Sequence, residues 1–119
     1  MLKKKKVVIL LFDSFGVGEA PDAKDFGDEG FDTLGHIVDY FKSNGKKLSL
    51  PNLSRKGLKK AAEHNRGKAL SIDIANGDDA IENAKYGYCA EISKGKDTPS
   101  GHWELVGVPV LFDWYYFTA

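Results

Sequence analysis

The sequence has little cysteine and little histidine, which excludes several kinds of site. Its single cysteine, Cys89, rules out an intramolecular disulfide and a zinc site built from several thiolates. Such a composition is typical of a reducing compartment, so we expect a cytoplasmic location and an ordinary core role for Cys89. The three histidines, His36, His64 and His102, have no metal-binding spacing among themselves. We therefore do not expect a metalloenzyme whose metal site is complete within these 119 residues.

Excess charge and long apolar stretches are also missing. Lys and Arg together number 17, as do Asp and Glu, so we expect neither nucleic acid nor an anionic membrane as a partner. The longest apolar run, Val7–Phe12, is too short to span a bilayer, and Asp13 ends it too early for a secretion signal. With 42% hydrophobic residues, the 119-residue chain is nevertheless expected to fold as one small domain.

Two apolar patterns predict β-strands. Val7–Phe12 is a continuous, partly β-branched run, which is typical of a strand buried on both faces in a parallel sheet covered by helices. Tyr86–Ile92 alternates larger apolar residues with small or polar ones, as a strand with one buried face does. The sequence therefore predicts an α/β architecture with these two segments in its sheet.

The region between these strands predicts two helices. Apolar residues at positions 34, 37, 38 and 41 share one helical face, with Asp32 as a capping residue and Gly45 as a stop. Pro51 is expected to open a second helix that continues to about residue 62.

Asp13 follows the first predicted strand directly. In open α/β sheets, ligands bind outside the carboxyl ends of the strands, where an acidic residue commonly holds a divalent cation. The alternative is a solvated turn residue. An aspartate-based phosphatase would need a second aspartate where Phe15 stands, and a receiver domain an acidic residue where Ser14 stands. The glycine-rich stretch from Asp13 to Gly30 has the length of a functional loop.

Thr98 begins the second candidate segment. Followed by Pro99, it fits the N-cap of a short helix that ends near Val106. Free amides of the first turn and the helix dipole would favour a phosphate on Thr98, whose hydroxyl becomes a nucleophile when a metal lowers its pKa. The alternative is that Thr98 only caps the helix. We expect His102 to be buried or beside a ligand rather than a ligand itself.

Three segments resemble, in the same order, the N-terminal part of the bacterial phosphopentomutases. They are FDSFGVGEAPDAKDFGDEGFDTLGHI (residues 12–37), LPNLSRKGL (50–58) and SKGKDTPSGHWELVGVPVLFDW (93–114). The resemblance implies the first part of an alkaline phosphatase-like core, with a mostly parallel sheet between two layers of helices. Residues 1–107 would belong to this core domain, and residues 108–119 would begin the connection to a cap domain that lies beyond this sequence.

The same resemblance implies the chemistry. Phosphopentomutases are isomerases that interconvert ribose or deoxyribose 1-phosphate and 5-phosphate through a phosphothreonine at a site with two manganese ions. Their K-D-T-x-x-G-H motif assigns the phosphorylated threonine, which is also a metal ligand, to Thr98. Their D-S-x-G-x-G-E-A-P-D motif assigns a metal ligand to Asp13. Two ligands of one hard cation each lie within about 2–2.5 Å of it, so we expect their oxygens within roughly 5 Å of each other.

The implied partners are small sugar phosphates, and the family's other metal ligands and substrate-binding residues have no counterpart in this sequence. We therefore expect the 119 residues alone to be inactive. The alternative is a non-catalytic binding or assembly module that retains the first half of the fold. The apolar segment Val108–Phe117 discriminates between the two, because a natural module would bury it and a fragment would expose it.

Overall fold

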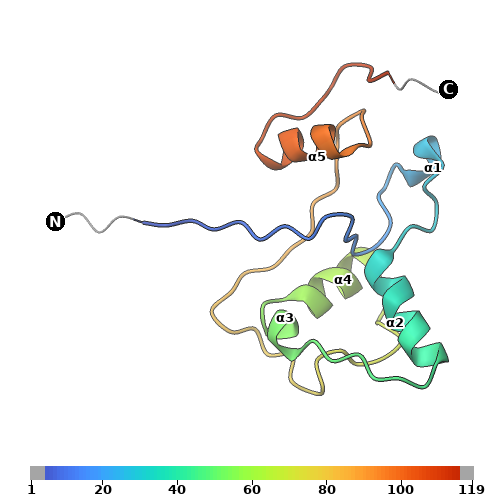
Figure 1. The fold of residues 1–119 in the computed structure, drawn as a ribbon, viewed down its shortest axis with the longest axis vertical. Helices are drawn as coiled ribbons and strands as arrows, with labels where there is room; N and C mark the ends of the chain where they lie inside the picture. Colours follow the sequence, from blue (N-terminus) through green and yellow to red (C-terminus); the bar gives the residue numbers. More distant parts are fainter. Residues whose placement is uncertain (1–4, 116–119) are drawn as a thin grey trace.

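The computed structural model describes residues 5–115. This part of the chain forms five helices joined by extended loops (Figure 1). The helices are α1 (Ala23–Phe26), α2 (Thr33–Ser43), α3 (Pro51–Arg55), α4 (Leu58–Arg66) and α5 (Thr98–Leu105). None of them is long and apolar enough to cross a membrane.

The predicted sheet is not formed within residues 5–115, where no segment is a β-strand. Val7–Phe12 is exposed instead of buried, with Val7 at 88% and Leu10 at 77% of full exposure. Figure 1 shows it leaving the helices as a single segment. Tyr86–Ile92 is likewise exposed except at Glu91. A strand is stable only when its backbone N–H and C=O groups pair with a neighbouring strand, and these two segments do not pair with each other.

The hydrophobic core lies among α2, α4 and the loop that follows α4. Its buried members are Leu34 and Val38 of α2, Ala62 of α4, and Leu70 and Ile74 of the loop. Partly buried apolar side chains surround them, namely Phe15, Val17, Leu48, Leu50, Leu58 and Ile72. Figure 1 shows α5 apart from this group, on the other side of the N-terminal segment. The core therefore stabilises α2, α4 and the loop after α4, and α5 must be held by other contacts.

The predicted limits of α2 are confirmed. The Asp32 carboxylate accepts a hydrogen bond of 3.0 Å from the Gly35 N–H, as an N-cap does, and the helix ends before Gly45, whose φ is 61°. Asp32 also pairs with Arg66 at the end of α4, at 2.6 Å between Oδ2 and Nε. The Arg66 and Asp32 side chains are only 7% and 14% exposed. This largely buried ion pair joins the start of α2 to the end of α4.

The second predicted helix is divided into α3 and α4. Pro51 opens α3 as expected, but Gly57 has a φ of 104° and interrupts the helix. A side chain at Gly57 would collide with Tyr86, which lies 29 residues later in the sequence. The helix therefore breaks where a distant aromatic ring approaches the backbone, which the local apolar pattern does not reveal.

Much of the chain surface remains uncovered. The accessible area is 9316 Å², whereas a compact protein of this mass exposes about 6400 Å². The radius of gyration of 16.9 Å likewise exceeds the roughly 13–14 Å of a compact domain of this length. In the apolar segment after α5, Val110 is buried but Val108, Leu111 and Phe112 are more than half exposed. Residues 116 and 117 of that segment lie outside the described residues.

A pair of matched substitutions tests the position of the core. Leu34→Ala removes a side chain that is 1% exposed and should lower the free energy of unfolding by about 2–5 kcal/mol, because it leaves a cavity. Leu105→Ala, at a helical position that is 58% exposed, should cost less than about 1 kcal/mol. Urea denaturation followed by circular dichroism measures both. Equal losses would show that the core lies elsewhere.

Candidate functional site

Asp13 and Thr98 line the same cleft, although 85 positions separate them in the sequence. The cleft has a volume of about 1140 Å³. Its walls come from the loop after Asp13, from residues 89–91 and from the segment that runs from Lys96 into α5. The two residues selected from the sequence motifs thus lie on one cleft, and the expected separation of their oxygens stays a prediction. Their roles as metal ligand and phosphate carrier stay predictions.

A tight turn presents Asp13 to the cleft. Ser14 has a φ of 57°, in the left-handed region that residues other than glycine adopt at a cost. Its N–H donates to Oδ1 of Asp13 at 3.1 Å, and its carbonyl accepts from the Thr33 hydroxyl at 3.2 Å. Because Thr33 is the first residue of α2, the turn is attached to the helix that carries the core.

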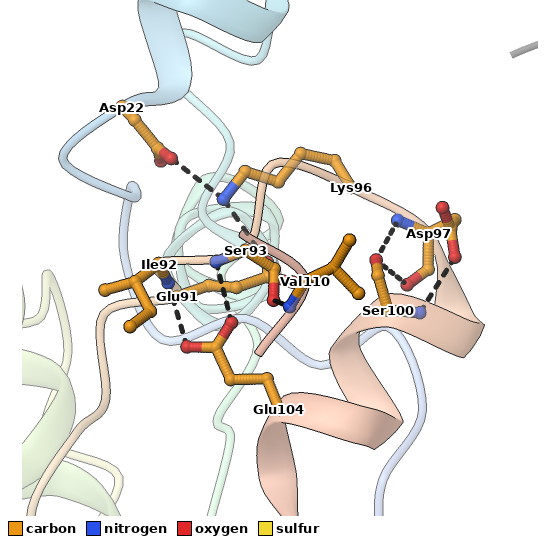
Figure 2. Close-up of polar contacts among 9 residues, drawn as sticks. All are labelled: Asp22, Glu91, Ile92, Ser93, Lys96, Asp97, Ser100, Glu104 and Val110. Carbon is orange, nitrogen blue, oxygen red and sulfur yellow. Dashed lines mark hydrogen bonds and ion pairs between the residues drawn. The ribbon is translucent and has the colours of Figure 1, made fainter. Parts of the chain in front are cut away.

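The N-cap of α5 is Asp97, not Thr98 as predicted. The Asp97 carboxylate accepts from the Ser100 N–H at 2.9 Å, and the Asp97 N–H donates to the Ser100 hydroxyl at 3.3 Å. Figure 2 shows this reciprocal pair, a capping box. Aspartate competes well for the N-cap, so Thr98 moves to the first helical position, where it is exposed. The reading of Thr98 as the helix cap is therefore wrong.

This change leaves the Thr98 hydroxyl uncommitted but occupies the amides around it. No hydrogen bond joins that hydroxyl to another residue within 5–115, whereas the Ser100 and Gly101 N–H groups both donate to Asp97. Pro99 has no N–H at all. The predicted free amides of Ser100 and Gly101 are thus already paired with Asp97, which leaves the helix dipole as the main contribution of α5 to holding negative charge.

His102 is not buried but lies beside Thr98, the other environment expected for it, whereas Cys89 differs from its predicted environment. His102 is exposed, and its Nδ1 lies 2.7 Å from the carbonyl oxygen of Thr98, one turn earlier in α5. Cys89 is exposed on the cleft instead of buried in a core, because the segment that carries it has no sheet to join. Of the other histidines, His36 is exposed on α2, and His64 packs edge-on against Tyr88. Within the described part of the chain, no three His, Cys, Asp or Glu side chains gather closely enough to hold a metal.

Glu104 holds α5 against the segment that precedes it, a role that the sequence analysis missed. Its carboxylate accepts 2.8 Å hydrogen bonds from the N–H groups of both Ile92 and Ser93 (Figure 2). The Ser93 hydroxyl in turn accepts from the Val110 N–H at 3.0 Å. Nothing in the pattern of residues 92–110 marks this arrangement, since it joins backbone groups to a side chain 11 and 12 positions away.

The comparisons with known proteins match these segments. The model of the Metalloenzyme superfamily matches residues 5–94. A phosphopentomutase of Proteus mirabilis is 55% identical over 120 residues, which cover 95% of this chain and 29% of that protein. Phosphopentomutases of Yersinia enterocolitica and Yersinia pestis are 52% identical, over 96% of this chain and 29% of theirs. The chain thus spans less than a third of the length of these relatives. No solved structure matches it.

The capping assignment predicts unequal effects on the stability of α5 for substitutions of two neighbouring residues. Asp97→Ala removes the carboxylate that caps α5 and should destabilise this helix by about 0.5–2 kcal/mol. Thr98→Ala removes a hydroxyl that caps nothing and should leave the helix nearly unchanged. Hydrogen exchange at the amides of residues 101–105 reports the local stability. Faster exchange in Thr98→Ala than in Asp97→Ala would contradict the assignment.

The contacts of Glu104 predict a dependence of stability on pH. Partial burial acts to raise its pKa, but hydrogen bonds from Ser93 and Ile92, together with the charge of Lys96, lower it by more. The net pKa is below the usual 4.5. A lowered pKa stabilises the folded state above 4.5, and this contribution is lost as the pH falls through the folded-state pKa. Unfolding experiments on both sides of pH 4.5 should show a smaller acid-induced loss in Glu104→Gln than in the unchanged chain.

Proposed function

Because the chain belongs to the Metalloenzyme superfamily, we propose that it forms the part of a phosphopentomutase that carries the phosphorylated threonine. The observation that supports this most directly is that Asp13 and Thr98 line one cleft. The capping of α5 by Asp97 adds to it, since it leaves the Thr98 hydroxyl uncommitted.

The proposed reaction is that of an isomerase. The relatives that are 52–55% identical are named phosphopentomutases, and such an enzyme moves a phosphoryl group between O1 and O5 of a pentose. The substrates are ribose or deoxyribose 1-phosphate and 5-phosphate, and neither nucleic acid nor a membrane takes part. We place the protein in the cytoplasm, where its one exposed cysteine stays reduced.

Thr98 would act as the phosphoryl carrier. Its phosphorylated Oγ1 gives the phosphoryl group to the free hydroxyl of the pentose monophosphate, which becomes a bisphosphate. The phosphoryl group at the other end then returns to Oγ1, so the enzyme is restored and the sugar has exchanged positions. The N-terminus of α5 favours the negative charge that Oγ1 bears during each transfer.

The two candidate ligands on the cleft are of the type that binds manganese, but they are too few to complete its coordination. The Asp13 carboxylate and the Thr98 hydroxyl are hard oxygen ligands of the type that Mn²⁺ accepts, whereas such an ion takes roughly six. When bound, the metal would lower the pKa of the threonine hydroxyl and neutralise charge on the phosphoryl oxygens. We expect these 119 residues alone to bind Mn²⁺ weakly and to be inactive.

The exposed apolar segment favours this proposal over a self-contained binding module. A module that functions alone would cover Val108, Leu111 and Phe112, yet each is more than half exposed. The two phosphopentomutase motifs also have no role in a module that lacks catalysis.

A chimeric enzyme tests the proposal. The matched 120 residues of the Proteus mirabilis phosphopentomutase are replaced by this chain, and the formation of ribose 5-phosphate from ribose 1-phosphate is measured. The chimera should be active, because the exchanged part supplies the threonine and one metal ligand. Thr98→Ala should abolish both turnover and phosphate incorporation into the protein, since it removes the atom that carries the phosphate.

Two further variants complete this test. Thr98→Ser keeps a hydroxyl at the same position and should retain part of the activity. Glu29→Gln, at an exposed position outside the cleft, is the matched control and should leave turnover unchanged. Near-normal turnover by Thr98→Ala in an active chimera would show that the nucleophile is another residue.

A further inference from the structure

We propose that Lys96 is a positioning residue that fastens the loop after Asp13 to the segment before Thr98. The proposal rests on the proposed function in taking Asp13 and Thr98 as parts of one site. The contact between the loop and the segment is a separate statement, which can be tested without a metal or a substrate.

The Lys96 side chain crosses from one wall of the cleft to the other. Its Nζ lies 2.9 Å from Oδ2 of Asp22 and 3.4 Å from Oε2 of Glu91. It also lies 5.0 Å from the centre of the Phe26 ring. Figure 2 shows the lysine extending from the segment before α5 to Asp22, beside α1. These contacts join a residue two positions before Thr98 to a loop that begins at Asp13.

Burial makes this contact stronger than an ordinary surface ion pair. The side chain of Lys96 is 14% exposed, and those of Asp22 and Glu91 are 31% exposed. Ion pairs screened from water in this way lose less of their attraction than exposed pairs do. Burial acts to lower the pKa of Lys96, but the hydrogen bond with Asp22 and the charges of Glu91 and Asp22 raise it by more, so the lysine stays charged.

The two carboxylates depend on this one ammonium group. Each places one oxygen on Lys96, and the remaining oxygens, Oδ1 of Asp22 and Oε1 of Glu91, are buried without a hydrogen-bond donor among residues 5–115. Removing the lysine charge would leave two partly buried carboxylates close to the same point without a counter-charge, which is unfavourable. The loop that carries Asp22 would then move away from the segment that carries Glu91 and Thr98.

Such a movement would separate the candidate site residues. The segment from Asp13 to Phe26, which ends in α1, is attached to α2 through Thr33 and Ser14. Helix α5 is attached to Ile92 and Ser93, the residues after Glu91, through Glu104. The contacts of Lys96 connect these two parts across the cleft. Lys96 therefore acts through the placement of Asp13 and Thr98 and needs no contact with the reacting atoms.

The single cysteine provides a probe of this connection in the chain as it exists. A nitroxide spin label on the exposed Cys89 reports, through paramagnetic broadening of NMR signals, how near the amides of residues 22–26 lie. We expect broadening in the unchanged chain, its loss in Lys96→Met and its return in Lys96→Arg. Unchanged chemical shifts at Leu34 and Val38 verify that each variant keeps its core.

Matched controls separate this role from a general effect of charge. Lys94→Met removes a lysine two positions away that pairs with exposed Asp113, and it should not change the broadening. Asp22→Asn breaks the same contact from the loop side, and adding it to Lys96→Met should cause no further loss. Broadening that persists in Lys96→Met, or that is lost equally in Lys94→Met, would overturn the proposal.

Adding Mn²⁺ to the unlabelled chain tests the consequence for the site. The ion should broaden the signals of both Asp13 and Thr98 in the unchanged chain and of only one of them in Lys96→Met. If Mn²⁺ broadens neither residue in the unchanged chain, the proposed metal site fails, while the result with the spin label still decides the role of Lys96. If it broadens both residues equally in Lys96→Met, the positioning role is wrong even though the metal site stands.

Discussion

Hydrogen bonds from backbone N–H groups to carboxylates hold the irregular parts of this chain in place. A buried N–H group needs an acceptor, and within residues 5–115 no sheet supplies one. Acidic side chains take that role instead. Asp32 caps α2, Asp97 caps α5, and Glu104 accepts from two consecutive amides before α5. Asp73 accepts from Ala75 and Gly77 in the loop after α4, and these bonds together with Lys59 lower its pKa.

One of these carboxylates, that of Asp97, also determines which groups of α5 remain available to a ligand in the cleft. Since Asp97 satisfies the first turn of α5, the neighbouring threonine keeps its hydroxyl free while the surrounding amides are used. A phosphate on Thr98 would consequently meet the helix dipole and any bound metal, not a ring of backbone donors. The helix cap thus separates the residue that stabilises α5 from the residue proposed to react.

The chain carries more apolar surface than its own core can cover. Buried packing is concentrated around α2 and α4, while α5 is attached through the hydrogen bonds of Glu104 and the edge-on contact of Trp103 with Trp114. The segment Val7–Phe12 has the composition of an interior strand, yet it is exposed because no strand within the described residues pairs with it. Composition describes the environment for which a segment is suited, and pairing partners determine whether it reaches that environment.

Local patterns in the sequence determined the features that depend on residues within one or two helical turns. The cap of α2 at Asp32, the stop before Gly45, the start at Pro51 and the end of α5 near Val106 are of this kind, because each involves side chains and amides a few positions apart. The two candidate site residues were also found from contiguous motifs. Only the tertiary structure decided the break at Gly57, the exposure of Cys89, the bonds of Glu104 and the cleft shared by Asp13 and Thr98. Each of these depends on groups that are distant in sequence, and no local periodicity records which distant groups will meet.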